Sequence, residues 1–329
     1  MTDEFNHRIF TNCKIERELF YDILKCSSDH RILTIESDSG RGKSRLVNNY
    51  KHHCRTSLTP IPVSLVDLST ISSVSQLIWQ ITDDFESSCR FSKLEEAQKT
   101  KNLGNHSKIR DMYSELSNPQ NLKRRKNKSS IDQIIGKIDL KNASLDGAKD
   151  NLFIGMQHNN YYIMPSLSEY PSQIHRDNSE EIEKLYEELC EAYFIDDLEY
   201  RLKRDIRNKS PKVILLDTYE KANEDVRLWL KKKLFPLILR SRARTYKLVI
   251  VIAGMVVPDF EADFAPELCQ KHIQSITAMS FWNDKDIFDV AEKYGVPKEL
   301  LSTGLIDRLQ KAPASLITSI LDNLKSVPL

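Results

Sequence analysis

The first residues whose types and spacing could do chemistry form the segment Ser37-Asp38-Ser39-Gly40-Arg41-Gly42-Lys43-Ser44. It fits the phosphate-binding pattern GxxxxGK[ST], except that serine stands at the first glycine position. Gly40 and Gly42 would let backbone N–H groups turn toward phosphate oxygens, and Lys43 would reach the β- and γ-phosphates. Ser44 would supply a hydroxyl to Mg²⁺. The segment predicts a nucleoside triphosphate site; the alternative interpretation is a flexible surface loop.

A second set of candidate residues lies at Val213-Ile214-Leu215-Leu216-Asp217, followed by Thr218, Tyr219 and Glu220. An apolar run that ends in a carboxylate is typical of a strand that delivers the carboxylate to the edge of a sheet. On a strand adjoining that of the glycine loop, Asp217 could hold a Mg²⁺-bound water, and Glu220 could orient or deprotonate the attacking water. The alternative is a strand-ending turn with a helix cap.

Two other groups of basic residues are more simply interpreted as solvated surface than as binding sites. Five basic residues between Lys123 and Lys128 could neutralise nucleic-acid phosphates, but no aromatic residue interleaves them, so a solvated charge run is preferred. Arg240, Arg242 and Arg244 could reach a neighbouring subunit's nucleotide, although a solvated helix end is the preferred interpretation. Met255 follows the apolar run 248–254, where a polar group sensing the γ-phosphate would be expected.

The elements that would position these residues follow from hydrophobic periodicity. Four short apolar runs predict strands, and the last two are rich in β-branched residues, as expected for central strands of a parallel sheet with both faces covered. The stretches between them have helical spacing, so strands and helices alternate. Strands are expected at 31–36, 61–68, 212–217 and 247–254, and helices at 14–27, 45–54, 73–85, 179–209 and 226–242.

Length and charge bound the interpretation. The 329 residues allow two domains or one enlarged domain, and 40% hydrophobic with 29% charged residues suits a globular protein with a buried core. The net charge of +1 gives no overall attraction to nucleic acid or anionic lipid. No run approaches the roughly 20 apolar residues of a membrane span, and no secretory signal is evident, so we expect a cytoplasmic location and no membrane contact.

In these motifs and their order, the chain resembles the STAND branch of P-loop ATPases, the NACHT-like and AAA+-related signalling switches of bacterial conflict systems. The resemblance lies in Phe10-Thr11-Asn12 with Glu16, SGRGKSRL, LLDTYE with Trp229, and VIVIAG. Residues 276–295 resemble the family's lid, and Lys311-Ala312-Pro313 its G-x-P motif. Departures from the family are Cys13 for arginine, Ser37 and Lys311 for glycines, and Met255 for a common arginine.

The resemblance implies a three-layer α/β/α P-loop NTPase with a mainly parallel sheet. We expect the first part of this domain at 1–85, a large insertion at 86–178, the remainder at 179–275 and a small C-terminal helical lid at 276–329. It also implies binding of ATP and Mg²⁺, slow hydrolysis, and a switch in assembly or partner binding, in antiviral defence. The expected partners are a second copy or a separate sensor or effector protein.

The residues expected to act follow from the motifs and the resemblance together. Catalysis is assigned to Lys43, Asp217 and Glu220, and Mg²⁺ binding to Ser44 and Asp217. The family's proline lies against adenine, which Pro313 would do here. A different class of function stays open: a non-hydrolysing scaffold whose insertion binds a partner protein or, less favoured, nucleic acid. Nucleotide contacts are expected from Gly40, Arg41, Gly42, Lys43, Ser44, Arg45 and Pro313.

Overall fold

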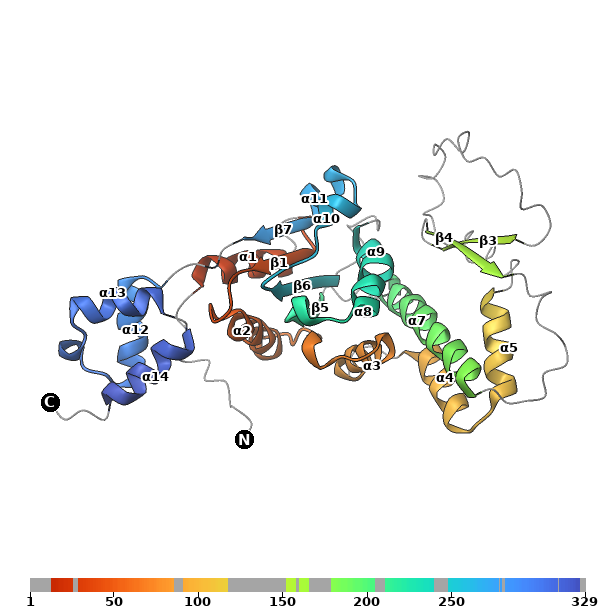
Figure 1. The fold of residues 1–329 in the computed structure, drawn as a ribbon, viewed down its shortest axis with the longest axis horizontal. Coiled ribbons are helices and arrows are strands. Elements are labelled where there is room, and N and C mark those ends of the chain that lie inside the picture. The colour runs from red at the N-terminus through yellow and green to blue at the C-terminus, as the bar shows by residue number, and fades with distance from the viewer. Residues whose placement is uncertain are drawn as a thin grey trace. The chain divides into compact units, whose positions relative to one another are not determined.

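The computed structural model shows an α/β protein built on a five-stranded, all-parallel sheet (Figure 1). The chain forms two compact units, one of residues 1–90, 202–227 and 238–329, the other of residues 91–201 and 228–237. The structure describes residues 13–25, 29–85, 91–117, 152–157, 160–165, 179–204, 211–239, 248–277, 279, 282–312 and 314–325.

The sheet has the order β2-β5-β6-β1-β7. Four of its strands lie at the apolar runs predicted above: β1 (Ile32–Glu36), β2 (Val63–Asp67), β5 (Lys212–Asp217) and β6 (Leu248–Gly254). The fifth, β7 (Ile273–Ile276), was not predicted, because its sequence IQSI is short and half polar. The expectation that β5 and β6 are central parallel strands is confirmed, and every residue of both is buried.

The expectation that the Asp217 strand adjoins the glycine-loop strand is wrong. Strand β6 lies between them and pairs with both, through Ile250 with Ile32 and with Ile214. Strand order depends on how each crossover connection traverses the sheet, and periodicity along the chain carries no information about that path.

Helices cover both faces of the sheet. On one face, α1 (Lys14–Leu24) and α2 (Lys43–Thr56) pack on alternate strand residues such as Leu33, Leu215 and Val251. Tyr50 and Phe20 stack there with ring centroids 4.0 Å apart, and the Tyr50 hydroxyl donates to the Glu16 carbonyl. The opposite face of β2 meets α3 (Val74–Phe85), whose Asp84 accepts from the Ser64 hydroxyl at 2.8 Å.

Helix α3 also satisfies the outer edge of β2. Asp84 Oδ2 lies 3.3 Å from the Leu65 backbone nitrogen, and Gln80 Nε2 donates to the Leu65 carbonyl at 3.2 Å. Because β2 is the last strand on this side of the sheet, these two groups have no strand partner beyond them. Side chains of α3 therefore take the place of a sixth strand at this position.

The rest of the first unit is mainly helical. A short 3-10 turn, η2 (Leu68–Thr70), follows β2, and η7 (Tyr219–Lys221) follows β5. Helices α10 (Phe260–Asp263) and α11 (Pro266–His272) connect β6 to β7. The C-terminal segment has its own buried cluster, centred on Ile287, Leu309 and Leu321. It consists of α12 (Asp284–Tyr294), η9 (Lys298–Leu300), α13 (Thr303–Lys311) and α14 (Ala314–Lys325).

The second unit is built around the helices α4 and α7. Helix α4 (Ser92–Asn102) has no capping side chain of its own, and Asp197 of α7 (Ser179–Arg204) accepts from the Lys93 and Leu94 amides at 2.9 and 3.4 Å. Phe194 contacts Phe91 and Trp229, so the buried Trp229 belongs to a core. Its other elements include α5 (His106–Ser117), the antiparallel pair β3 (Leu152–Gln157) and β4 (Asn160–Pro165), and the π-helical η8 (Leu230–Leu234). Helices α8 (Glu224–Trp229) and α9 (Phe235–Leu239) have residues in both units.

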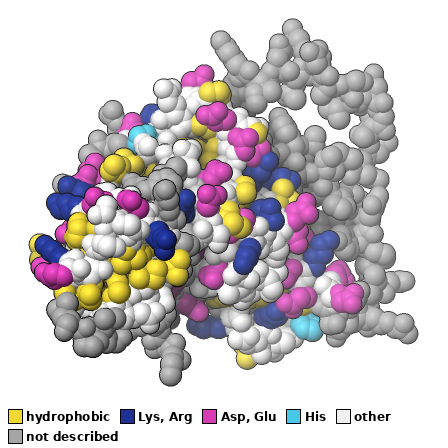
Figure 2. Space-filling model, turned by 60° about the vertical axis from the view of Figure 1, so that its left-hand side comes forward, with side chains coloured by type: hydrophobic (Ala, Val, Ile, Leu, Met, Phe, Trp, Pro, Cys, Tyr) yellow, Lys and Arg dark blue, Asp and Glu magenta, His cyan; other side chains and the backbone are white. Residues whose placement is uncertain are grey.

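Surface charge matches the near-zero net charge. On the described part of the face in Figure 2, Lys and Arg side chains are interspersed with Asp and Glu, without a broad field of one sign. Among the described residues, no helix combines the length and the apolar character needed to cross a membrane.

Candidate functional site

The glycine loop, residues 37–44, joins the end of β1 to the start of α2. Gly40 and Gly42 adopt φ of 80° and 95°, a left-handed conformation that glycine reaches without a steric cost. Ser37, in contrast, does not have a positive φ. Its Cβ, at the position where the pattern has glycine, therefore does not cause the backbone strain that a positive φ would produce.

The N-terminus of α2 has the features of an anion-binding end. Its N-cap is Gly42, which offers no side-chain cap, and its first turn carries no acidic residue. The first amide groups of a helix point outward with a partial positive charge. Together with the glycine loop, this 14-residue helix presents unneutralised donors at the position where the sequence pattern places phosphate.

Lys43 folds back onto the loop that precedes it. Its Nζ donates to the carbonyl oxygens of Ser37 and Asp38, at 2.5 and 2.8 Å. Burial lowers the pKa of Lys43, while the nearby carboxylates of Glu220, Asp217 and Asp38 act in the opposite direction. The ammonium group thus lies within the field of both acidic residues that the sequence singled out, and its present partners are neutral carbonyls that an anion could replace.

Asp217 lies at the C-terminal end of β5 and is 8% exposed. Its Oδ1 accepts from the Thr218 amide at 2.9 Å, and the Ser44 hydroxyl lies close enough to the carboxylate to lower its pKa by hydrogen bonding. Burial raises the pKa of Asp217, the charge of Asp67 raises it further, and the Ser44 and Thr218 bonds oppose both. The structure therefore brings together two residues that the sequence assigned to the same Mg²⁺ ion, although β6 separates their strands.

Glu220 is positioned by a strained turn. Thr218 adopts φ 58°, which is unusual for a β-branched residue and is one of two such non-glycine positions in the described chain. The turn leads into η7, and there the Glu220 Oε2 accepts from the Met255 amide at 3.0 Å. Backbone strain of this kind is often retained at functional sites, where it fixes the direction of a side chain.

Two residues that contribute to this site, Asp67 and Met255, were not identified as site residues from the sequence. Asp67 ends β2 and pairs in register with Asp217, so their carboxylates lie at the ends of neighbouring strands. The run VSLVD ends in aspartate as VILLD does, so a sequence signal for Asp67 existed. Met255 acts through its backbone amide, which every residue except proline possesses, so no sequence signal for this role existed.

The remaining predicted residues divide into two groups. Arg41 is half-buried in the loop, and Arg45 is exposed on the first turn of α2. Phe10, Thr11 and Asn12, Pro313, the basic cluster 123–128 and the three arginines at 240–244 lie outside the described residues.

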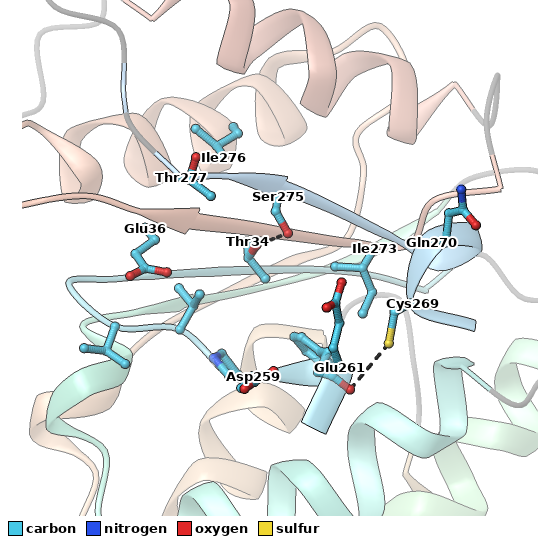
Figure 3. A pocket seen from close by; sticks show the side chains of 14 residues that line it. Thr34, Glu36, Asp259, Glu261, Cys269, Gln270, Ile273, Ser275, Ile276 and Thr277 are labelled. Atoms are coloured by element: carbon cyan, nitrogen blue, oxygen red, sulfur yellow. Dashed lines mark hydrogen bonds between the residues drawn. The ribbon is translucent and has the colours of Figure 1, made fainter. Parts of the chain in front are cut away.

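A cavity of about 460 Å³ opens on the other face of the sheet from α2, beside the end of β1 (Figure 3). Thr34 and Ser275 face each other across β1 and β7, with a hydrogen bond between their hydroxyls at 3.0 Å. Glu36, Asp259 and Glu261 contribute carboxylates, and the residues following β6 form one wall. None of residues 37–44 lines this cavity. It is therefore distinct from the glycine-loop site.

The comparisons with known proteins identify no family. No family model matches the chain, and no curated protein is significantly similar to it. The described residues contain no group of three or more His, Cys, Asp or Glu side chains arranged to hold a metal ion by themselves. A divalent cation at this site would need oxygen ligands from a bound nucleotide or water as well as from the protein.

Proposed function

We propose that the chain is an ATP-binding switch of the STAND type, which hydrolyses ATP slowly and changes its assembly or partner binding when nucleotide is bound. The observation that carries the proposal is that Ser44 and Lys43, at the start of α2, lie close enough to the buried Asp217 carboxylate to lower its pKa. These residues come from separate motifs, and a surface loop with no ligand would not require them to meet.

The residues present fit a nucleotide with its magnesium ion. The α2 N-terminus and the loop glycines would hold phosphate oxygens, and Lys43 would exchange its carbonyl partners for the β- and γ-phosphates. Ser44 and Asp217 would hold Mg²⁺, which supplies charge neutralisation between the β- and γ-phosphate oxygens. Glu220 would orient or accept a proton from the attacking water.

The fold supports a ligand at this edge of the sheet. The connection leaving β1 runs through α2 on one face toward β2, whereas the connection leaving β6 runs through α10 and α11 to β7, on the far side of β1. Open α/β sheets bind ligands outside the carboxyl ends of neighbouring parallel strands whose connections leave on opposite faces of the sheet. The glycine loop starts at the carboxyl end of β1.

The test is binding of ATP and GTP, each with and without Mg²⁺, followed by thermal shift, mass in solution and phosphate release. Wild-type protein should be stabilised by Mg²⁺-ATP, because a ligand that binds only the folded state shifts unfolding by mass action. Lys43→Ala should lose the stabilisation, and Lys51→Ala, on the same helix α2, should keep it. Stabilisation without phosphate release would favour a non-hydrolysing scaffold with a structural nucleotide. No stabilisation by any nucleotide would exclude the ATP switch and favour a scaffold that binds none.

A further inference from the structure

The end of β6 contacts both halves of the proposed site through one peptide unit. The Gly254 carbonyl accepts from the Ser37 amide at 3.2 Å, at the start of the glycine loop. The next amide, that of Met255, donates to Glu220 Oε2 at 3.0 Å. The two groups of the Gly254–Met255 peptide therefore join the phosphate-binding loop to the candidate base without any side chain of their own.

Gly254 is the residue that allows this approach. A Cβ built on it would lie 2.7 Å from Glu220 Oε2 and 2.5 Å from the Val256 carbonyl oxygen, both shorter than real Cβ contacts. Its φ is not in the left-handed region, so the restriction comes from these neighbours and not from backbone conformation. Any other residue would move Glu220, the chain after β6, or both.

The carboxylate held in this way still acts on Lys43 of the glycine loop. Among the charges acting on Lys43, that of Glu220 has the largest effect, greater than that of Asp217. A hydrogen bond from Met255 to Oε2 fixes the carboxylate by one oxygen and leaves Oε1 able to accept a bond from water. Met255 has its side chain 43% exposed, so packing of the methionine does not explain why the chain turns here.

We propose that the Gly254–Met255 peptide is the positioning element for Glu220 and couples it to the glycine loop, in place of a polar sensor side chain after this strand. The inference rests on the proposed ATPase function. A phosphate bound in the loop would shift Ser37, and the Ser37–Gly254 bond would pass that shift to the Met255 amide and so to Glu220. Glycine at 254 and any residue with an N–H at 255 are then required for turnover, not for nucleotide binding.

The experiment measures ATP turnover and ATP affinity separately for Gly254→Ala and Met255→Pro, the second of which removes the amide donor. Both should lower kcat on the order of 10²-fold, the loss expected when a catalytic group is misplaced by about an ångström, with little change in the dissociation constant for ATP. Gly304→Ala on α13 is the matched control, because a Cβ there meets nothing within 4 Å. Thermal unfolding and circular dichroism establish that each variant is folded.

A double-mutant series separates positioning from structural damage. If Gly254 acts through Glu220, Gly254→Ala should cause no further loss of turnover in a Glu220→Gln background. Equal fractional losses in both backgrounds, or a parallel loss of ATP affinity, would show that the substitution damages the loop and would overturn the inference. Full turnover by Gly254→Ala and Met255→Pro would overturn it while leaving the ATPase proposal intact. Wild-type protein without turnover would overturn both.

Discussion

The Ser44 hydroxyl lies close enough to the Asp217 carboxylate to lower its pKa by hydrogen bonding, although β6 lies between β1, which precedes the glycine loop, and β5, which ends in Asp217. The contact is possible because Ser44 lies on the first turn of α2, which starts at the carboxyl edge of the sheet, where β5 also ends. A helix N-terminus and a strand end thus meet across an intervening strand.

Replacing Ser44 should separate metal-dependent from metal-independent binding. Ser44→Ala removes one charge-assisted hydrogen bond and one oxygen ligand, so the affinity for Mg²⁺-ATP should fall roughly ten- to a hundredfold, while affinity for ATP without Mg²⁺ changes little. Calorimetric titration with and without Mg²⁺ measures both values. Ser39→Ala in the same loop is the control and should match wild type. Equal weakening with and without Mg²⁺ would argue against a metal-binding role for Ser44.

Loss of the Asp84 carboxylate should destabilise the first unit. Asp84→Ala leaves the buried Ser64 hydroxyl and the Leu65 amide without their acceptor, which should lower the free energy of unfolding by about 1–3 kcal/mol. Chemical denaturation measures this change. Asp83→Ala is the matched control, since Asp83 is the exposed neighbour on α3, and its effect should stay within about 0.5 kcal/mol. Similar effects for the two variants would contradict the role assigned to Asp84.

Asp197 should act as the N-terminal cap of α4 in the second unit. Asp197→Ala should lower the free energy of unfolding of this unit by about 1–2 kcal/mol, the usual effect of losing a capping side chain. Hydrogen exchange should quicken first in α4. Asp196→Ala removes a partly exposed ion pair with Lys93, so it should cost less than about 1 kcal/mol. An equal loss in both variants would mean that the cap contributes nothing specific.

The same residue predicts a pH dependence of stability. Burial raises the pKa of Asp197 above the value of 3.8 of an unperturbed aspartate, against the opposing effect of the Lys93 and Leu94 amides. An acid that binds its proton more tightly in the folded protein contributes stability at low pH, and this contribution is lost as the pH rises through the folded-state pKa.

Asparagine at this position keeps an acceptor oxygen but cannot titrate. The difference in unfolding free energy between wild type and Asp197→Asn should therefore shift in favour of wild type as the pH falls from about 7 to about 4. Denaturation of both proteins across this range gives the difference directly. A constant difference would show that folding does not shift the pKa of Asp197, and an oppositely directed difference would show that the fold prefers the charged form.

Much of the sheet could be predicted from the sequence, because four strands are apolar runs that contrast with their surroundings. The fifth, β7, has only one buried residue among its four, Ile276, so no period or apolar run distinguished it. Strand order escaped prediction for a different reason. The placement of β6 between β1 and β5 results from how the connections before and after β6 pass over the sheet, which depends on long-range packing.

The glycine loop and Asp217 could be found because their chemistry requires particular side chains at particular spacings. The interaction that holds Glu220 could not, because its donor is the backbone of Met255 and its approach depends on a missing Cβ at Gly254. From the sequence alone, a single glycine at a strand end can be explained in many ways. The reason for glycine at position 254 becomes clear only from the short distances between a Cβ built there and atoms of Glu220 and Val256.

The arrangement at Leu65 bears on how copies of this protein can associate. A strand at the edge of a sheet is ordinarily a template to which a second chain can add its own strand, as in amyloid-like aggregates and domain-swapped dimers. Here Asp84 and Gln80 already bond the amide and the carbonyl of Leu65. An incoming strand would have to displace both side chains, so strand addition at β2 is disfavoured. An oligomer that extended the sheet beyond β2 would therefore have to give up both of these bonds.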